Sequence, residues 1–330
     1  MTSKAFGLAQ LGNAYADGAL SNRNKIINGS MTIDQRNAGA AVSANGAYPT
    51  DRWQLGISGG TWSVQQSSTA PAGFSKSTAI TISTGYSKSV SDQNNFRQFV
   101  EGSNTYDLGW GASGAQSVTL SFWVRSSLTG TFAGSLMNSA FDRSYVFTYS
   151  ISAADTWEYK TVSIEGDTSG TWLTTNGVGV RVFFDLGSGS NSETTAGAWT
   201  AGEYRRVSGA VDVVATTGAT FYITGVQLEA GDTATPFEHR SYGAELALCQ
   251  RYYYFETDKL VGTYGYDPFK LNINVTFPVT MRANATFVTT STSSHMSLVT
   301  ASNRFVAFRN SSSIPAVGDI YLSFTASAEL

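Results

Sequence analysis

The strongest fold signal in the chain is the stretch Ser117-Val118-Thr119-Leu120-Ser121-Phe122-Trp123-Val124-Arg125, in which apolar and polar side chains alternate. A period of two is that of a β-strand with one buried face. Val118, Leu120, Phe122 and Val124 share one face, and Trp123 points the other way. The sequence therefore predicts a strand here whose inner face contributes to a hydrophobic core.

Further strands are predicted on either side of this stretch. Residues 159–164, 178–186 and 220–228 are rich in β-branched and aromatic side chains, and Gly, Ser and Asn clusters such as 187–192 separate the strands. No long helical periodicity occurs between residues 25 and 240. This pattern predicts an all-β fold, an antiparallel sandwich or jelly roll, over residues 25–240.

The two ends of the chain differ from this central region. Residues 1–24 have a few apolar side chains between glycines, which predicts a thin N-terminal arm without its own core that a partner orders. Residues 242–251 form the best helical stretch and predict a short connector. The alternating segment 271–277 follows, with shorter ones beyond it. We therefore expect a smaller β-sandwich domain over residues 241–330.

Composition excludes several classes of protein. Of 330 residues, 42% are hydrophobic, which is enough for a sizeable core. The formal charge is 21 − 24 = −3, so the basic surface of a nucleic-acid-binding protein is missing. No run of about 18 apolar residues predicts a membrane span. The first residues lack the apolar core of a signal peptide, so we expect synthesis in the cytoplasm and, if the protein leaves the cell, another route such as a virus particle.

Enzymatic and metal chemistry have little support in the sequence. One cysteine, Cys249, and two histidines exclude a metal centre rich in Cys or His. The phosphate-binding pattern Gly-x-x-x-x-Gly-Lys-Ser does not occur. Glu229 is the first candidate for a structural calcium ion, but no Asp-x-Asp-x-Asp-Gly run supports it. Spacing alone does not bring together the two carboxylates that glycan hydrolysis requires. We therefore predict no metal, no cofactor and no enzymatic activity.

Aromatic side chains are the candidate ligand-binding residues. Trp110 lies in the glycine-rich segment 106–114, with little nearby to pack on, and loops commonly carry binding residues. Trp123 faces away from the apolar face of its strand, toward a ligand, a second subunit or, if the opposite side is the outer one, the core. The alternative is that all these tryptophans fill the core. We predict a carbohydrate site in which three aromatic residues stack on sugar rings and three polar residues assist: Trp110, Tyr106, Trp123, Asn104, Asp107 and Arg125.

A second aromatic run indicates self-association. Tyr252-Tyr253-Tyr254-Phe255 would expose aromatic rings on both faces of a strand, and a small domain buries only one face. The other face requires a second subunit, or it packs between the two domains. Together with the 271–277 strand, the run predicts an oligomer interface formed by Tyr252, Tyr254, Phe255 and Phe277.

Several motifs resemble those of a known group of proteins. The segments 23–31, 33–37 and 48–53 resemble the opening of many tail-fibre-like proteins of tailed phages and prophages. Residues 221–238 resemble the closing strand of that family's jelly roll. The segments Cys249–Tyr253 and Phe277–Ala283 resemble its C-terminal part.

This resemblance implies a virion fibre that recognises the host, with a jelly roll similar to carbohydrate-binding modules. Such fibres are usually homotrimers, and the arm at residues 1–24 would then dock onto other virion proteins. The expected activity is reversible adhesion to a host surface glycan. Two alternatives remain open: a head fibre or a capsid or tail decoration protein that binds only other virion proteins, and a fibre that depolymerises glycan.

Overall fold

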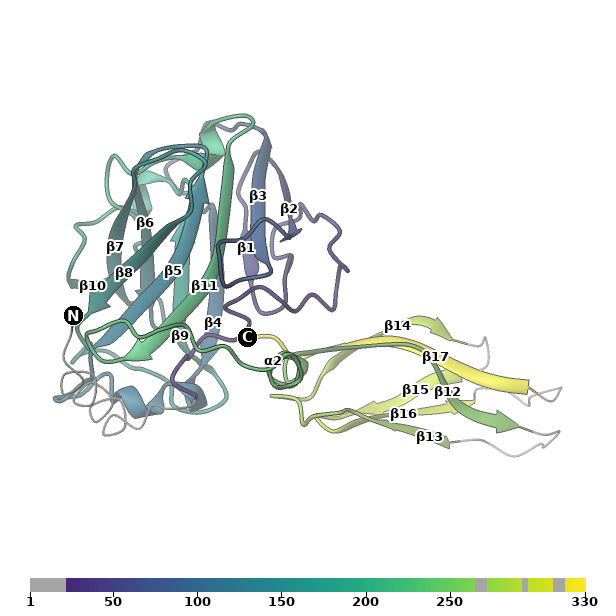
Figure 1. Ribbon diagram of the computed structural model, residues 1–330. Coiled ribbons are helices and arrows are strands. Elements are labelled where there is room, and N and C mark those ends of the chain that lie inside the picture. The colour runs from purple at the N-terminus through teal and green to yellow at the C-terminus, as the bar shows by residue number, and fades with distance from the viewer. Residues whose placement is uncertain (1–21, 265–271, 293–295, 311–317) are drawn as a thin grey trace, which may run out of the picture. The chain divides into compact units, whose positions relative to one another are not determined.

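The computed structural model describes residues 22–264, 272–292, 296–310 and 318–330. The predicted arm at residues 1–24 therefore lies almost wholly outside the described residues. The chain divides into two compact units, Met1–Arg240 and Ser241–Leu330. Antiparallel strands dominate both units (Figure 1), which confirms the predicted all-β fold class.

Unit 1 is a sandwich of two antiparallel sheets that lie face to face (Figure 1). The six-stranded sheet has the order β1 (Gln54–Gly56), β4 (Asn95–Glu101), β9 (Val178–Asp185), β6 (Gly130–Met137), β7 (Arg143–Ile151) and β10 (Trp199–Ala201). The five-stranded sheet has the order β2 (Thr61–Ser67), β3 (Ser77–Thr84), β11 (Thr220–Ala230), β5 (Val118–Ser126) and β8 (Glu158–Ile164). Apart from the β6–β7 and β2–β3 hairpins, neighbouring strands in these orders are not consecutive in sequence, as expected of a jelly roll.

The core of unit 1 combines aliphatic and aromatic side chains. On β5, Val118, Leu120, Phe122 and Val124 are fully buried, as the alternation predicts. Phe122 meets Phe184 of the opposite sheet edge-to-face, with ring centroids 5.0 Å apart. Complete burial of a large apolar side chain contributes about 1.5–3 kcal/mol, so these rings stabilise the contact between the two sheets.

The segment from residue 22 to β1 has little regular secondary structure and is held by asparagine side chains. Asn28 Nδ2 donates to the carbonyl oxygens of Ile33 and Asp51, each at 2.9 Å, and Oδ1 accepts from the Ile33 amide at 3.0 Å. The Trp53 indole, in turn, donates to the Asn28 carbonyl at 3.0 Å. Asn24 Oδ1 accepts from the Leu228 amide of β11 at 3.0 Å. Side-chain amides thus satisfy backbone groups that no sheet pairs.

Unit 2 begins with helix α2 (Tyr242–Gln250), which is capped by the Ser241 hydroxyl accepting from the Ala244 amide. One three-stranded sheet has the order β12 (Tyr253–Tyr264), β17 (Gly318–Ser327) and β14 (Thr286–Thr292). The other has the order β13 (Asn272–Thr276), β16 (Phe305–Asn310) and β15 (Met296–Ala301). Tyr254, Phe277 and Phe324 form the aromatic centre of its core, with ring centroids 5.9–6.4 Å apart. A smaller β-domain follows the jelly roll, as predicted.

In the part of the chain that the structure describes, no helix has the length and apolar character needed to cross a bilayer.

We predict that Asn28→Ala lowers the free energy of unfolding by about 2–4 kcal/mol. The change removes three buried hydrogen bonds, and it places alanine at a φ of 57°, which alanine adopts unfavourably. Urea denaturation measures the loss. Asn191→Ala, at an exposed position, should stay within about 0.5 kcal/mol of the parent. Equal losses in both variants would contradict the role given to Asn28.

Candidate functional site

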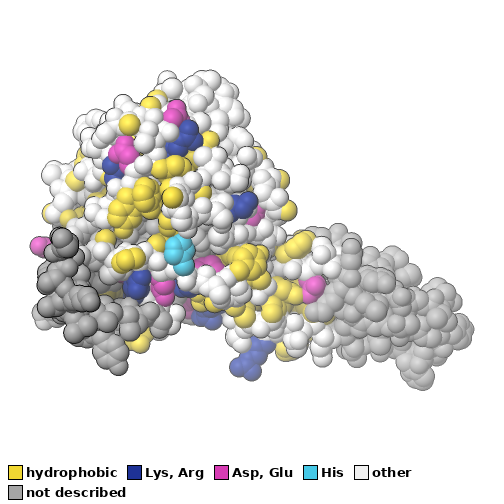
Figure 2. All heavy atoms as spheres, viewed as in Figure 1, with side chains coloured by type: hydrophobic (Ala, Val, Ile, Leu, Met, Phe, Trp, Pro, Cys, Tyr) yellow, Lys and Arg dark blue, Asp and Glu magenta, His cyan; other side chains and the backbone are white. Residues whose placement is uncertain are grey.

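The outer face of the five-stranded sheet carries an open groove of about 450 Å³. Figure 2 shows hydrophobic side chains gathered on this face beside a histidine. A volume of about 300–1,000 Å³ is usual for small-molecule sites, so the groove has room for sugar rings. Its lining includes Phe74, Trp123, Tyr159, Gly225, Pro236, Phe237 and His239.

Strand pairing places the first wall of the groove. Trp123 of β5 lies directly opposite Tyr159 of β8 in the antiparallel pairing. Their ring centroids are 5.3 Å apart with an interplanar angle of 45°. Trp123 is half-buried and Tyr159 is 42% exposed. Two neighbouring aromatic faces on paired strands form a fixed apolar platform that is open to solvent.

Three rings from distant segments form the second wall. Phe74 precedes β3, and Phe237 and His239 follow β11. The Phe74 centroid lies 5.1 Å from that of Phe237 and 5.3 Å from that of His239. His239 is exposed, so its ring supplies hydrogen-bonding nitrogens at the edge of an otherwise apolar wall.

A buried polar network holds this wall on the sheet. The segment after β11 folds back along the strand, and the Glu238 amide donates to Gln227 Oε1 at 2.8 Å. The Thr235 amide donates to Glu229 Oε1 at 2.9 Å, and Gln227 Nε2 donates to the same oxygen at 2.8 Å. Gln227 and Glu229 are thereby buried on the outer face of the sheet. Without these bonds, nothing in the sheet ladder would position Phe237 and His239.

Gly225 forms the floor between the two walls. It lies in a β-bulge, where the β11–β5 register shifts between Thr224 and Gln227, and its φ is +63°. A Cβ atom at this position would approach Phe74 Cζ to 2.7 Å and Trp123 Cδ1 to 3.1 Å. Only glycine therefore allows both rings to approach the backbone.

The aromatic surface continues along the same face of the sheet. Tyr222 of β11 is the cross-strand partner of Arg125, whose guanidinium lies 5.0 Å from the Tyr222 ring centroid. Arg125 also pairs with Asp155, with Nη2 to Oδ1 at 3.0 Å. Trp157 also lies beside Tyr222, with ring centroids 6.2 Å apart. Polar and aromatic groups therefore extend the lining beyond the groove.

The structure does not bring the six predicted binding residues together. Trp123 and Arg125 lie on the groove face. Asn104 and Tyr106 are in the 3₁₀ helices η1 (Gly102–Asn104) and η2 (Tyr106–Leu108), near Asp107 and Trp110. Asn104 is exposed, and Asp107 pairs with Lys25 at 2.5 Å.

The expectation that Trp110 has little to pack on is wrong. Its side chain is 9% exposed and meets Trp172 and Trp199 edge-to-face, at 4.7 and 5.3 Å. The indole nitrogen donates to the Gln116 carbonyl at 2.7 Å. The two other tryptophans come from loops far along the chain and supply the packing surface that the local sequence lacks.

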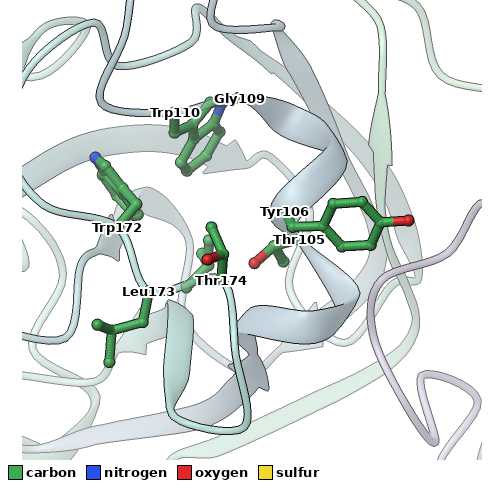
Figure 3. A pocket seen from close by; sticks show the side chains of 8 residues that line it. Thr105, Tyr106, Gly109, Trp110, Trp172, Leu173 and Thr174 are labelled. Atoms are coloured by element: carbon green, nitrogen blue, oxygen red, sulfur yellow. The ribbon is translucent and has the colours of Figure 1, made fainter.

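The space beside Trp110 is too small for a sugar. Its volume is about 30 Å³, which corresponds to about one water molecule. Figure 3 shows Tyr106 projecting away from this space, and its side chain is 65% exposed. Trp110 and Tyr106 therefore do not present adjacent stacking faces.

The predicted oligomer-interface residues are mostly internal, and the prediction is wrong for three of them. Tyr252, Tyr254 and Phe277 are 0%, 9% and 8% exposed. The alternation in this run points Tyr252 and Tyr254 inward and Phe255 outward, at 39% exposure. On β14, Val288 is 56% exposed and pairs with the same residue as Phe255, Thr325 of β17. Phe255, Thr325 and Val288 thus form one row across this sheet, the Phe255–Val288 row, with an exposed apolar side chain at each end.

Metal ligands are not clustered in the described ranges, which contain no group of three or more His, Cys, Asp or Glu able to hold an ion. The calcium candidate Glu229 is 2% exposed. Its carboxylate accepts hydrogen bonds from Gln227 and Thr235, and it lies 3.7 Å from Arg23. Both oxygens of this carboxylate therefore already accept hydrogen bonds from the protein.

No protein family model and no curated protein matches the sequence. The chain is similar to several solved structures over somewhat less than two thirds of its length. One is the enzymatically active domain of tailspike protein 4 from bacteriophage CBA120, with 13% identity, a TM-score of 0.34 and coverage of 64% of this chain and 22% of that chain. This chain thus matches less than a quarter of the tailspike chain.

Two further similar structures are described as sugar-binding. A putative sugar-binding protein from Bacteroides thetaiotaomicron has 14% identity, a TM-score of 0.33 and coverage of 63% of this chain and 100% of that chain. A xylan-binding domain from Paenibacillus barcinonensis has 10% identity, a TM-score of 0.27 and coverage of 60% and 99%. The groove residues, rather than these similarities, are the basis of the function proposed below.

We predict stability losses of different size for the two tryptophans. Trp110→Ala removes a buried ring and should lower the free energy of unfolding by about 3–5 kcal/mol. Trp123→Ala removes a half-buried ring on the outer face and should cost about 1 kcal/mol. Urea denaturation of both variants provides the comparison. A cost for Trp123→Ala equal to that of Trp110→Ala would show that Trp123 is a packing residue.

Proposed function

We propose that this chain is a non-catalytic phage tail-fibre protein that adheres to a host surface glycan through the groove of unit 1. The observation that carries the proposal is the pair of solvent-facing rings, Trp123 and Tyr159, on adjacent strands of a groove of about 450 Å³. The resemblance of residues 23–53 and 221–238 to tail-fibre-like proteins supports the virion setting.

The chemistry of the groove suits a sugar ring. The C–H face of a pyranose packs on an aromatic face, and its hydroxyl groups need hydrogen-bond partners at the edge. His239 and Thr235 lie at the edge of the groove, and Arg125 continues the same face. The aromatic rings therefore bind the apolar faces of the ligand, and the edge residues set its orientation.

Each such contact is weak on its own. A fibre with three copies of the chain presents three grooves, and the second and third bind at a high effective concentration once the first is occupied. Self-association is therefore part of the proposed mechanism. The Phe255–Val288 row of unit 2 carries an exposed apolar side chain at each end, which a second copy can cover.

We predict that Tyr159→Ala weakens glycan binding at least about tenfold, the equivalent of 1.4 kcal/mol. Tyr106→Ala is the matched control, because this tyrosine is also exposed but lies away from the groove. A glycan array identifies a ligand, and calorimetry then compares the two variants. The proposed site is wrong if Tyr106→Ala, rather than Tyr159→Ala, abolishes binding.

The same ligand distinguishes adhesion from cleavage. Incubation of the chain with the bound polysaccharide should release no new reducing ends, and their release would indicate a depolymerase. Immunogold labelling of particles should place the chain on the tail. Label on the head, together with an empty glycan array, would indicate a decoration protein instead.

We predict a trimer in solution, with a mass near 3 × 35.2 = 105.6 kDa by light scattering. Val288→Asp places a charge in the Phe255–Val288 row and should shift the mass toward 35.2 kDa, because burying an unpaired charge is costly. Val90→Asp, at another exposed valine, should leave the mass unchanged. A monomeric parent protein would contradict the avidity mechanism.

A further inference from the structure

The outer face of the six-stranded sheet carries arginines between phenylalanines. Phe96 and Val100 of β4 and Val182 and Phe184 of β9 point into the core. Arg97 and Phe99 of β4 and Arg181 and Phe183 of β9 alternate with these residues and therefore point outward. Arg97 pairs across the strands with Phe183, and Phe99 pairs with Arg181.

The phenylalanine rings support the guanidinium groups. Arg97 and Arg181 both lie over the Phe99 ring, with Cζ 5.4 and 5.1 Å from its centroid. Arg181 also lies 3.6 Å from the Phe141 centroid. Arg205, from the loop after β10, lies 4.9 Å from the Phe183 centroid. Stacking of this kind fixes the plane of a guanidinium group and leaves its N–H edges available for hydrogen bonds.

The positive charge of this cluster is not balanced by the protein. Glu203 pairs with Arg205, and among the described residues no other carboxylate forms an ion pair with Arg97, Arg181 or Arg205. Burial is the main cause that lowers the pKa of Arg181 to about 10. The positive charges of Arg97 and Arg205 lower this pKa further, whereas the negative charge of Glu203 raises it. Burial, followed by the charge of Arg205, also lowers the pKa of Arg97.

Arg206, also in unit 1, is a buried arginine whose positive charge is neutralised by carboxylates. Arg206 is as buried as Arg205, at 1% exposure. It pairs with Asp185 at 3.3 Å, with Glu193 at 3.7 Å and with Asp212. It also donates to the backbone carbonyl of Ser188 at 2.9 Å. The Arg97, Arg181 and Arg205 cluster has a single carboxylate for three cations.

Several polar atoms of the cluster, and of Asn95 two residues before Arg97 on β4, are buried without a hydrogen-bond partner in the described part of the chain. They include Nε and Nη1 of Arg181, Nε and Nη1 of Arg205, and both amide atoms of Asn95. Arg205 and Asn95 are almost completely buried, at 1% and 0% exposure. Buried donors are normally satisfied, and unsatisfied ones indicate a group that is absent. An acceptor carrying negative charge would satisfy both the hydrogen bonds and the charge.

We infer that the cluster of Arg97, Arg181 and Arg205 binds the oxyanion of an acidic sugar, that is, a carboxylate or a sulfate or phosphate ester on a glycan. Guanidinium groups bind each of these in a bidentate manner. Phe99 and Phe141 are half-buried beside the arginines, and their rings provide apolar surface for the attached sugar ring. This site is on the other sheet and does not depend on the groove proposed above.

The test uses the full chain and an array of carboxylated, sulfated and phosphorylated oligosaccharides, each beside its neutral counterpart. We expect at least one acidic oligosaccharide to bind about tenfold or more tightly than its neutral counterpart. Arg97→Gln and Arg181→Gln should each weaken that binding at least about tenfold. Arg304→Gln, at an exposed position in unit 2, removes the same charge and should leave it unchanged. Tyr159→Ala should also leave it unchanged, because Tyr159 lines only the groove.

Thermal unfolding establishes that each variant is folded. Arg181→Lys keeps the positive charge but loses the bidentate geometry, so this variant should bind the acidic oligosaccharide more weakly than the parent does. The inference is overturned if no acidic oligosaccharide binds better than its neutral counterpart, or if binding survives Arg97→Gln and Arg181→Gln. It is also overturned if inorganic sulfate competes as tightly as the oligosaccharide, because the site would then bind the ion alone. A lower solution mass of Arg97→Gln would instead identify the cluster as a subunit contact.

Discussion

The alternation of side chains along β5 couples the core of unit 1 to its outer surface. Phe122 packs against Phe184 of the opposite sheet, and the next residue, Trp123, faces the groove. A shift of one residue in the pairing of β5 would exchange these two faces. The inward burial of four apolar residues opposes such a shift, so the energy that stabilises the core also positions the ligand platform.

The other wall of the groove depends on polar groups rather than on a strand. Gln227 and Glu229 point to the outer face of β11, where a sheet would normally be solvated, yet they are buried by the segment that folds back over them. A buried polar network that is fully satisfied fixes one arrangement, because any other leaves charged or polar atoms unpaired. Phe237 and His239 are therefore as well positioned as residues of a strand. Gly225 lets Phe74 of the same wall and Trp123 of the opposite wall approach the backbone closely.

Local patterns predicted several strands, among them β5, β8, β9 and β11, together with the short helix and the outward direction of Trp123, because each depends on neighbouring residues alone. They failed for Trp110, whose packing partners Trp172 and Trp199 are 62 and 89 positions away in sequence. Tyr159 was within reach of the same alternation, since it begins a predicted strand. The second groove wall was not predictable, because it joins segments before β3 and after β11, and a buried polar network holds the later segment on the sheet. The arginine cluster was not predictable either, because it depends on the pairing of β4 with β9.

The two outer faces of the sandwich differ in what stabilises them. Exposure of the groove rings costs the folded state little free energy, since exposed aromatic surface is common on folded proteins. The arginine cluster is different: three desolvated cations share the single carboxylate of Glu203, which opposes folding, as the downward shifts in the pKa of Arg97 and Arg181 indicate. An anion that binds there stabilises the folded state by an amount that grows with its concentration relative to its dissociation constant. Anion binding at this face and the stability of the jelly roll are therefore linked, because the anion offsets the free-energy cost of the buried charges. Ligand binding in the groove offsets no such cost.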